Sequence, residues 1–374
     1  KSLVCGVGSS RSIPELCAKL GSKRPLIVTD EGLMKLGLLD FMSSSVSSTT
    51  IFSGVTPDPT EENVKDALEV ARMQGCDGVV GFGGGSSLDV AKVVAYLASS
   101  PSTDTPDFKS MYGVDRLVGS RLPLIQVPTT AGTGSEVTPI SILTNASKLK
   151  QGVVSPTLLP DYAVLDGNLT LTVPPATTAH TGVDAMVHAI EAYTTAIKKN
   201  PLSDLCALEA LRILTSNIDA CVTSGASSPS ARNEMLYGSA LAGMAFANAP
   251  VGGVHALAYP LGGMFGVPHG LSCSLMLPAV MEFNAGEGEC AEMYVRIGRE
   301  MFPGSGVDTA EGVLEEVIRM IERLGLPRKL KEVGVEEGDV ERMADESMKQ
   351  VRLLPNNPRE LGRDDAVSIY NSIL

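Results

Sequence analysis

The first half of the chain alternates short apolar runs with amphipathic stretches. RPLIVTD (24–30), DGVVGFGGG (77–85) and PLIQVPTT (123–130) predict strands, while NVKDALEVARMQG (63–75) and SSLDVAKVVAYLAS (86–99) predict helices. Strands that alternate with helices are typical of a parallel sheet with crossover helices. The first half therefore predicts an α/β domain.

The pattern changes at the proline pair Pro174-Pro175, which interrupts any regular element. Beyond it the apolar residues recur almost only with helical spacing, in DAMVHAIEAYTT, LSDLCALEALRILTSNI, ARNEMLYGSALAGMAFANA, CAEMYVRIGREMF, AEGVLEEVIRMIERLG and DDAVSIYNSIL. A chain of 374 residues is long for one domain. We therefore expect an α/β domain over residues 1–175 and an all-helical domain over 176–374.

Composition narrows the class of protein. Hydrophobic residues make up 44% of the chain and charged residues 20%, which is typical of a globular protein with a sizeable core. The net charge of −13 argues against a nucleic-acid partner, because phosphate binding needs clustered Lys and Arg. No apolar run reaches the roughly 18 residues that cross a bilayer, so no membrane partner is expected either. A globular enzyme is the simplest interpretation.

The seven cysteines are scattered, odd in number and without a C-x-x-C pair. This pattern predicts neither a disulfide framework nor a thiolate metal site, and it favours a reducing compartment such as the cytoplasm. Because the chain begins with Lys1 rather than Met, a removed organelle-targeting leader remains open.

Two loops rich in small residues are candidate nucleotide-binding elements. GFGGGSSLD (81–89) follows a predicted strand and opens a predicted helix, where backbone N–H groups can cradle a phosphate. It matches neither G-x-G-x-x-G nor the P-loop pattern, and it is also compatible with a plain strand–helix turn. PTTAGTGSE (128–136) follows another predicted strand. Both loops are expected at the carboxyl ends of strands, where open α/β sheets bind ligands.

Asp30, which ends the first predicted strand, has two possible roles. Its carboxylate could bind the ribose 2′-hydroxyl of a dinucleotide and repel a 2′-phosphate. It could equally cap the start of the following helix, EGLMKLG.

Three of the four histidines lie in apolar stretches and suggest a metal. Asp184 and His188 are spaced i, i+4 on one face of a predicted helix. His255 and His269 bracket a stretch rich in Gly and Pro, and they can converge only if that stretch turns. Three imidazoles and one carboxylate suit Fe²⁺ or Zn²⁺, although each histidine alone could be an ordinary core residue. His180 competes as a ligand by spacing, but it fits the entry of the helix better.

The motifs together resemble the iron-containing (group III) alcohol dehydrogenase family along essentially the whole chain. The matching stretches, in the order of that family, are GGGSSLD, PTTAGTGSEVT, TGVDAMVHAIEAY, HALAYPLGGMFGVPHG and LLPNNPREL. The resemblance implies a Rossmann-like dinucleotide-binding domain followed by a helical metal-binding domain, as in the dehydroquinate synthase-like architecture. It also implies a homodimer.

The resemblance also assigns roles to residues. It implies that the metal, Fe²⁺ or alternatively Zn²⁺, is bound by Asp184, His188, His255 and His269. It places the cofactor NAD against Asp30, Gly83, Gly84, Gly85, Ser86, Thr129, Thr130, Thr133 and Lys150. Phe246 corresponds to a pocket wall near the nicotinamide, and Tyr259 stands where the family usually has a second histidine that is proposed to relay a proton.

The activity implied is reversible hydride transfer between NAD(H) and a small alcohol, aldehyde or ketone. Two other enzymes stay open as alternatives. One is a 2-hydroxyacid–oxoacid transhydrogenase of the same family, which keeps its nicotinamide bound. The other is a lyase like dehydroquinate synthase, which the GGGSSLD and TGVDAMVHAIEAY motifs disfavour.

Overall fold

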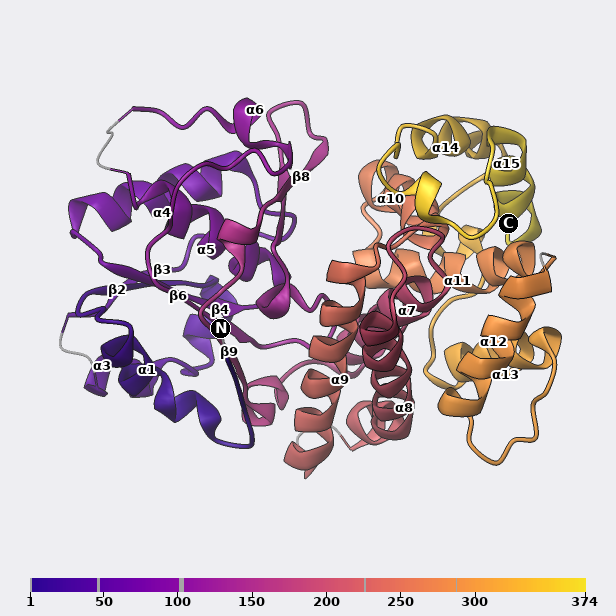
Figure 1. Ribbon diagram of the computed structural model, residues 1–374, viewed down its shortest axis with the longest axis horizontal. Helices are drawn as coiled ribbons and strands as arrows, with labels where there is room; N and C mark the ends of the chain where they lie inside the picture. The colour runs from indigo at the N-terminus through magenta and orange to yellow at the C-terminus, as the bar shows by residue number, and fades with distance from the viewer. Residues whose placement is uncertain (1, 46–47, 101–103, 225–226, 287) are drawn as a thin grey trace. The chain divides into compact units, whose positions relative to one another are not determined.

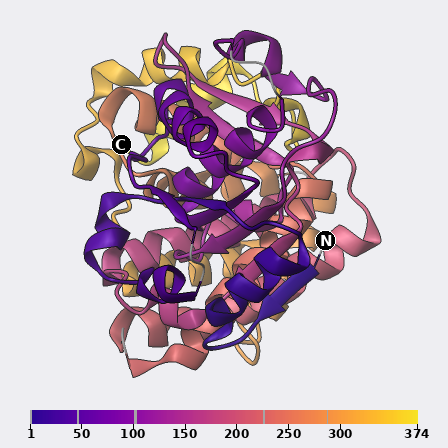
Figure 2. The same cartoon turned by 90° about the vertical axis from the view of Figure 1, so that its left-hand side faces the viewer.

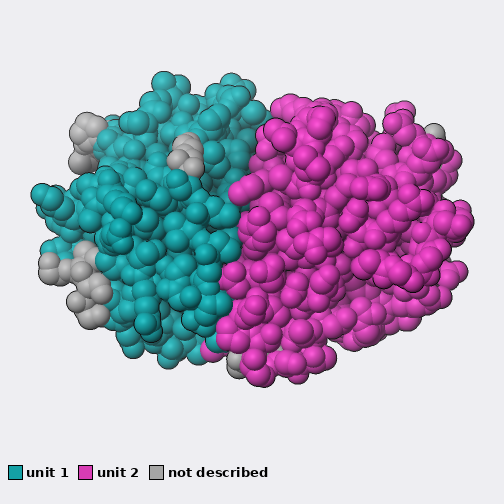
Figure 3. All heavy atoms as spheres, turned by 60° about the horizontal axis from the view of Figure 1, so that its bottom comes forward, with its two compact units in different colours: residues 1–171 teal, residues 172–374 magenta. Residues whose placement is uncertain are grey.

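The computed structural model describes residues 2–45, 48–100, 104–224, 227–286 and 288–374. The chain divides into two compact units, residues 1–171 and 172–374 (Figure 3). The division falls close to the boundary at residue 175 that the sequence suggested.

Unit 1 is built on a parallel sheet of six strands in the order β1-β9-β6-β4-β2-β3. The strands are β1 (Ser2–Cys5), β2 (Pro25–Val28), β3 (Thr50–Phe52), β4 (Gly78–Gly83), β6 (Leu124–Pro128) and β9 (Tyr162–Leu165). All adjacent pairs run in the same direction, so the carboxyl ends of the strands meet at one edge (Figures 1 and 2). The predicted parallel α/β sheet is confirmed.

Helices cover both faces of this sheet, as the alternation of side chains along the strands requires. Leu26 and Val28 of β2 pack into one cluster with residues of α4 (Glu61–Met73) and α5 (Gly85–Leu97). Ile27, between them, points to the other face. There it joins residues of α1 (Ile13–Lys19) and α3 (Asp40–Ser45), which lie across the sheet from α4 and α5 in Figure 1.

Short elements complete unit 1. A second, three-stranded sheet has the order β5-β8-β7 and is formed by β5 (Gly113–Val114), β7 (Ile140–Thr144) and β8 (Lys150–Val154). The short helices α2 (Glu31–Lys35) and α6 (Phe108–Met111) lie in connections. The sequence pattern did not predict this sheet, because its strands are short and one of them spans two residues.

Unit 2 is helical throughout the residues that the structure describes. Its helices are α7 (Pro175–Thr194), α8 (Pro201–Thr223), α9 (Pro229–Asn248), α10 (Gly253–Phe265), α11 (His269–Ala285), α12 (Gly288–Met301), α13 (Ala310–Arg323), α14 (Val340–Ser347) and α15 (Arg363–Ser372). Helices α7, α8 and α9 pack side by side (Figure 1). The predicted all-helical second half is confirmed.

Within the described ranges, no single helix has both the length and the apolar composition to span a membrane. Helices α9 and α10 meet that standard only as a pair, across a bend of 108°.

Candidate active site

The glycine turn of unit 1 connects the central strand β4 to α5. Gly83 has a φ of 156°, a conformation that side chains disfavour, and a Cβ on it would come within 2.6 Å of the Ser87 hydroxyl. Gly84 caps the start of α5, and a Cβ on Gly85 would meet the Thr133 methyl at 2.7 Å. Glycine therefore lets Ser87 and Thr133 pack directly against the turn, and the first N–H groups of the 13-residue helix α5 have no partner within that helix.

The second loop lies directly beside this turn. Strands β4 and β6 are neighbours, with Gly83 paired to Pro128, and the Thr129 N–H donates to the Gly83 carbonyl at 3.0 Å. Thr130 lies close to Gly84, and Thr133 lies close to Gly85. The two loops thus form one surface at the carboxyl edge of the sheet, as their placement after strands suggested. Half-buried Ser86 belongs to the first turn of α5 in this surface.

A buried ion pair supports the second loop, and the sequence pattern did not predict it. The Lys92 ammonium donates to the Ser135 hydroxyl at 2.7 Å and lies 3.7 Å from Asp89. Asp89 in turn accepts from the Ser135 hydroxyl at 2.6 Å and from the Ile142 N–H at 2.8 Å. Burial lowers the pKa of Lys92 to about 8. The signal was available in DVAK, where a carboxylate and an ammonium are spaced i, i+3 in an otherwise apolar helix.

Asp30 and Lys150 already have partners within unit 1. Asp30 Oδ1 accepts from the Leu33 N–H at 3.0 Å, so the carboxylate caps α2. Lys150, on β8, forms an ion pair of 2.7 Å with Asp58. The helix-cap interpretation of Asp30 therefore holds in the structure, while contact of either residue with a nucleotide stays a prediction.

In unit 2 the turn required by His255 and His269 is present. His255 lies in the first turn of α10, which ends at Phe265, and left-handed Gly266 follows at φ 67°. His269 opens α11. A Cβ on Gly270 would come within 2.4 Å of the His180 carbonyl, so glycine lets α11 start directly against α7. Two residues distant in sequence thereby reach Asp184.

Four donors converge at this point: Asp184, His255, His269 and Cys273, whose ligand atoms all lie within 4.8 Å of one another. Asp184 Oδ1 is 3.7 Å from His269 Nε2 and 4.0 Å from His255 Nε2. Ligands bound to one tetrahedral metal at roughly 2.0–2.3 Å lie about 3–4 Å apart, so this spacing suits a metal.

The burial of Asp184 and His255 also indicates a bound cation. Asp184 and His255 are each 3% exposed, and neither Asp184 Oδ1 nor His255 Nε2 has a hydrogen-bond partner. Buried polar atoms without partners are costly unless something binds them. Burial alone would raise the pKa of Asp184, but the charges of His188, His269 and His255 lower it below its usual range. The donor set therefore fits a divalent cation.

His188, the remaining predicted ligand, lies next to this group. Its ring stacks on His255 at a centroid distance of 4.7 Å and on Phe246 of α9 at 4.5 Å. Phe246 thus packs against the candidate metal centre, while its predicted place at a nicotinamide stays a prediction. His180 is half-buried and lies outside the four-donor group.

A second carboxylate, Glu191, orients His255 and was not predicted. Glu191 Oε2 lies 2.5 Å from His255 Nδ1, and Oε1 accepts from the Val254 N–H at 2.7 Å. Burial alone would lower the pKa of His255. The negative charges of Glu191 and Asp184 outweigh that effect, so the pKa of His255 is raised. A carboxylate behind a metal-binding imidazole fixes its ring and directs Nε2 to the metal. The signal was spacing: Asp184, His188 and Glu191 share one face of α7 at i, i+4 and i+7.

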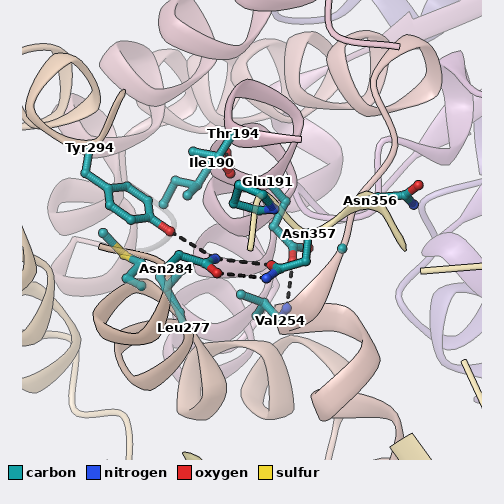
Figure 4. Close-up of a pocket in the computed structure, with 12 residues that line it drawn as sticks. Ile190, Glu191, Thr194, Val254, Leu277, Asn284, Tyr294, Asn356 and Asn357 are labelled. Carbon is teal, nitrogen blue, oxygen red and sulfur yellow. Dashed lines mark hydrogen bonds between the residues drawn. The ribbon is translucent and has the colours of Figure 1, made fainter. Parts of the chain in front are cut away.

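The motif LLPNNPREL near the C-terminus packs next to the residues that hold His255. Figure 4 shows Asn357 beside Glu191 and Val254, and its amide exchanges hydrogen bonds of 2.7 and 3.1 Å with that of Asn284. A Cβ on Gly253 would come within 2.6 Å of Asn357 Oδ1. The motif therefore packs against the start of α10, where His255 lies.

Tyr259 lies one turn after His255 on α10. Its ring centroid is 6.0 Å from that of His269, so it borders the four-donor group. Burial raises the pKa of Tyr259, which keeps the phenol protonated at neutral pH.

Comparisons with known proteins agree on one family. Residues 1–167 match the model described as iron-containing alcohol dehydrogenase, and residues 178–374 match that of the Fe-containing alcohol dehydrogenase family, C-terminal. The chain is 38% identical to long-chain-alcohol dehydrogenase 1 of Geobacillus thermodenitrificans, over 96% of this chain and 91% of that protein.

Two solved structures are similar over the whole chain. The structure of a 1,3-propanediol oxidoreductase has a TM-score of 0.94 and 35% identity, covering 100% of this chain and 98% of that one. A sulfoacetaldehyde reductase from Bifidobacterium kashiwanohense in complex with NAD⁺ has a TM-score of 0.90 and 28% identity, covering 100% and 96%.

The geometry predicts that Glu191→Gln weakens metal binding by about tenfold to a hundredfold, because the amide keeps the size of the side chain but removes the charge behind His255. Competition between the protein and a fluorescent chelator measures the affinity. Glu282→Gln, at an exposed position of α11, is the matched control and is expected to leave it unchanged. Equal affinities of the two variants would contradict the role given to Glu191.

Proposed function

The chain belongs to the iron-containing alcohol dehydrogenase family, and we propose that it transfers hydride reversibly between NAD(H) and a small alcohol or the corresponding aldehyde or ketone. The single observation that carries this proposal is the group of four donors around Asp184, in which the buried Asp184 Oδ1 and His255 Nε2 atoms have no hydrogen-bond partner and are suited to a cation. The names of the similar proteins, which include an alcohol dehydrogenase and a 1,3-propanediol oxidoreductase, support the substrate class.

Unit 2 holds the metal in this proposal. Asp184, His255 and His269 bind Fe²⁺, with Zn²⁺ as the alternative, and His188 completes the ligand set that the family resemblance predicts. Such a cation supplies Lewis-acid polarisation of the substrate oxygen. Glu191 holds His255 in place, and Phe246 stacks on His188.

Unit 1 binds the dinucleotide in this proposal. The glycine turn at Gly83–Gly85 and the start of α5 receive the pyrophosphate, and Ser86, Thr129, Thr130 and Thr133 border it. Lys92 and Asp89 anchor the Thr133 side of this surface through Ser135. Lys150 is a further candidate contact, although it would have to share its charge with Asp58. The NAD⁺ complex of the similar reductase supports the choice of cofactor.

Tyr259 orients the substrate or a water by donating a hydrogen bond. With its pKa raised, the phenol is a poor proton acceptor near neutral pH, unlike the imidazole that the family usually has at this position. The substrate proton then has to leave by water or by the cofactor ribose.

We further propose that the chain works as a homodimer in the cytoplasm. All seven cysteines are thiols in the structure, which supports a reducing compartment. The homodimer rests on the family resemblance, and light scattering on the purified protein tests it.

Iron-reconstituted protein is expected to form NADH from a panel of primary alcohols and diols. His269→Ala should abolish both turnover and metal occupancy, since it removes one of the converging ligands. His180→Ala, which changes a neighbouring histidine outside the four-donor group, should retain the metal. Full metal occupancy in the His269 variant would refute the assignment. Exchange of hydride between two acids without free NADH would instead identify the transhydrogenase.

We expect the protein to prefer NADH over NADPH by about tenfold or more. A carboxylate at Asp30 close to a 2′-phosphate costs on the order of 1–4 kcal/mol at effective dielectric constants of roughly 20–80. Asp30→Asn should relax the preference while keeping an acceptor for the helix cap, which separates recognition from loss of the cap. Equal kcat/KM values for NADH and NADPH in the unmodified protein would show that Asp30 does not meet the ribose.

Tyr259→Phe is expected to lower kcat about tenfold, equivalent to ~1.4 kcal/mol of transition-state stabilisation, with metal content and cofactor affinity unchanged. Only a hydrogen-bond donor is removed, so the loss is modest. Steady-state kinetics and elemental analysis test both statements. A loss above about a thousandfold with the metal retained would make Tyr259 the essential acid instead.

A further inference from the structure

Cys273 lies inside the candidate metal centre, although neither the sequence pattern nor the family resemblance pointed to it. It follows His269 by one turn of α11, so both side chains lie on the same face of that helix. Its Sγ is 3.8 Å from His269 Nε2 and belongs to the group of ligand atoms within 4.8 Å of one another. The residue is fully buried.

We infer that Cys273 is a ligand of the metal at this centre and that its sulfur favours zinc over iron. The inference rests on the proposed function, since it concerns the same centre. It does not rest on the cysteine alone, because the buried Asp184 Oδ1 and His255 Nε2 atoms face the same point without hydrogen-bond partners. Together with His269, these residues supply one sulfur, two nitrogens and one oxygen. Four donors complete a tetrahedral set, in which Cys273 takes the place that the family resemblance gives to His188; His188 is not among the four donors that converge here.

The charge and softness of a thiolate ligand determine which metal this centre prefers. On binding, the thiol loses its proton to solvent and the thiolate bonds to the cation, with no change of oxidation state. A thiolate and the Asp184 carboxylate together neutralise a divalent ion, whereas the three-histidine set leaves it one net positive charge. Thiolates are soft ligands that suit zinc, and zinc already exceeds ferrous iron in affinity for most donor sets. Cys273 therefore enlarges the advantage of zinc.

Cobalt(II) titration of the metal-free full-length protein tests the ligand directly, without any assay of activity. A thiolate ligand adds an intense sulfur-to-cobalt charge-transfer band in the near ultraviolet to the weak visible d–d bands. We expect this band in the unmodified protein and its loss in Cys273→Ala. Cys221→Ala removes another fully buried thiol of unit 2, on α8, and should retain the band. Cys273→Ser keeps the size of the side chain if the alanine variant fails to fold.

Competition titrations with zinc and ferrous iron test the selectivity. Cys273→Ala and Cys273→Ser should lower zinc affinity relative to iron affinity by about tenfold or more, on the scale by which loss of supporting groups weakens metal sites. An unmodified protein that binds cobalt with d–d bands alone overturns the inference and leaves the proposed metal centre standing. An unchanged zinc-to-iron ratio in both variants overturns the selectivity. Failure to bind any of the three metals overturns both proposals.

Discussion

The cost of burying unpaired polar atoms governs the helical unit. Asp184 sits in the middle of α7, in a stretch where almost every neighbouring residue is buried, and one of its oxygens has no hydrogen-bond partner. A buried carboxylate costs free energy unless positive charge offsets it. Three histidines from three helices surround Asp184 and hold its pKa below its usual range. The packing of α7, α10 and α11 therefore brings these histidines to Asp184. The hydrogen-bonded pair Asn284 and Asn357 packs beside Glu191 and stabilises the start of α10.

Unit 1 also buries a charged group, but there the protein itself supplies its hydrogen-bond partners. Lys92 is as deeply buried as Asp184, but its ammonium is fully engaged by hydroxyls, a carbonyl and Asp89. Such a satisfied network is structural, because it leaves no atom for a ligand. The contrast separates these two buried charges: Lys92 holds a loop against the sheet, whereas Asp184 keeps an oxygen that a cation can bind.

Periodicity sufficed for the parallel sheet and for the long helices. Helices α4 and α8 also begin with a capping box, which marks where each one starts. Periodicity did not predict the helices in which glycine and proline are frequent. Helices α10 and α11 contain Pro260 and Pro278, and the residues between His255 and His269 look like a loop although most are helical. Without the start of α11 at His269, the one-turn relation to Cys273 stays hidden. Glu191 was within reach, because it lies on the face of α7 that carries Asp184 and His188.

The absence of a side chain at Gly270 has a consequence for metal exchange. The backbone of α11 abuts the backbone of α7 at this point, with no flexible side chain between them to absorb movement. The spacing of Asp184 and His269 is then set by two rigid helices rather than by the cation. Such a site is preorganised, so its ligands lose little conformational entropy when a metal binds. Removal of the metal with a chelator should therefore leave unit 2 folded and ready to be reloaded, unlike small domains in which metal binding and folding are one event.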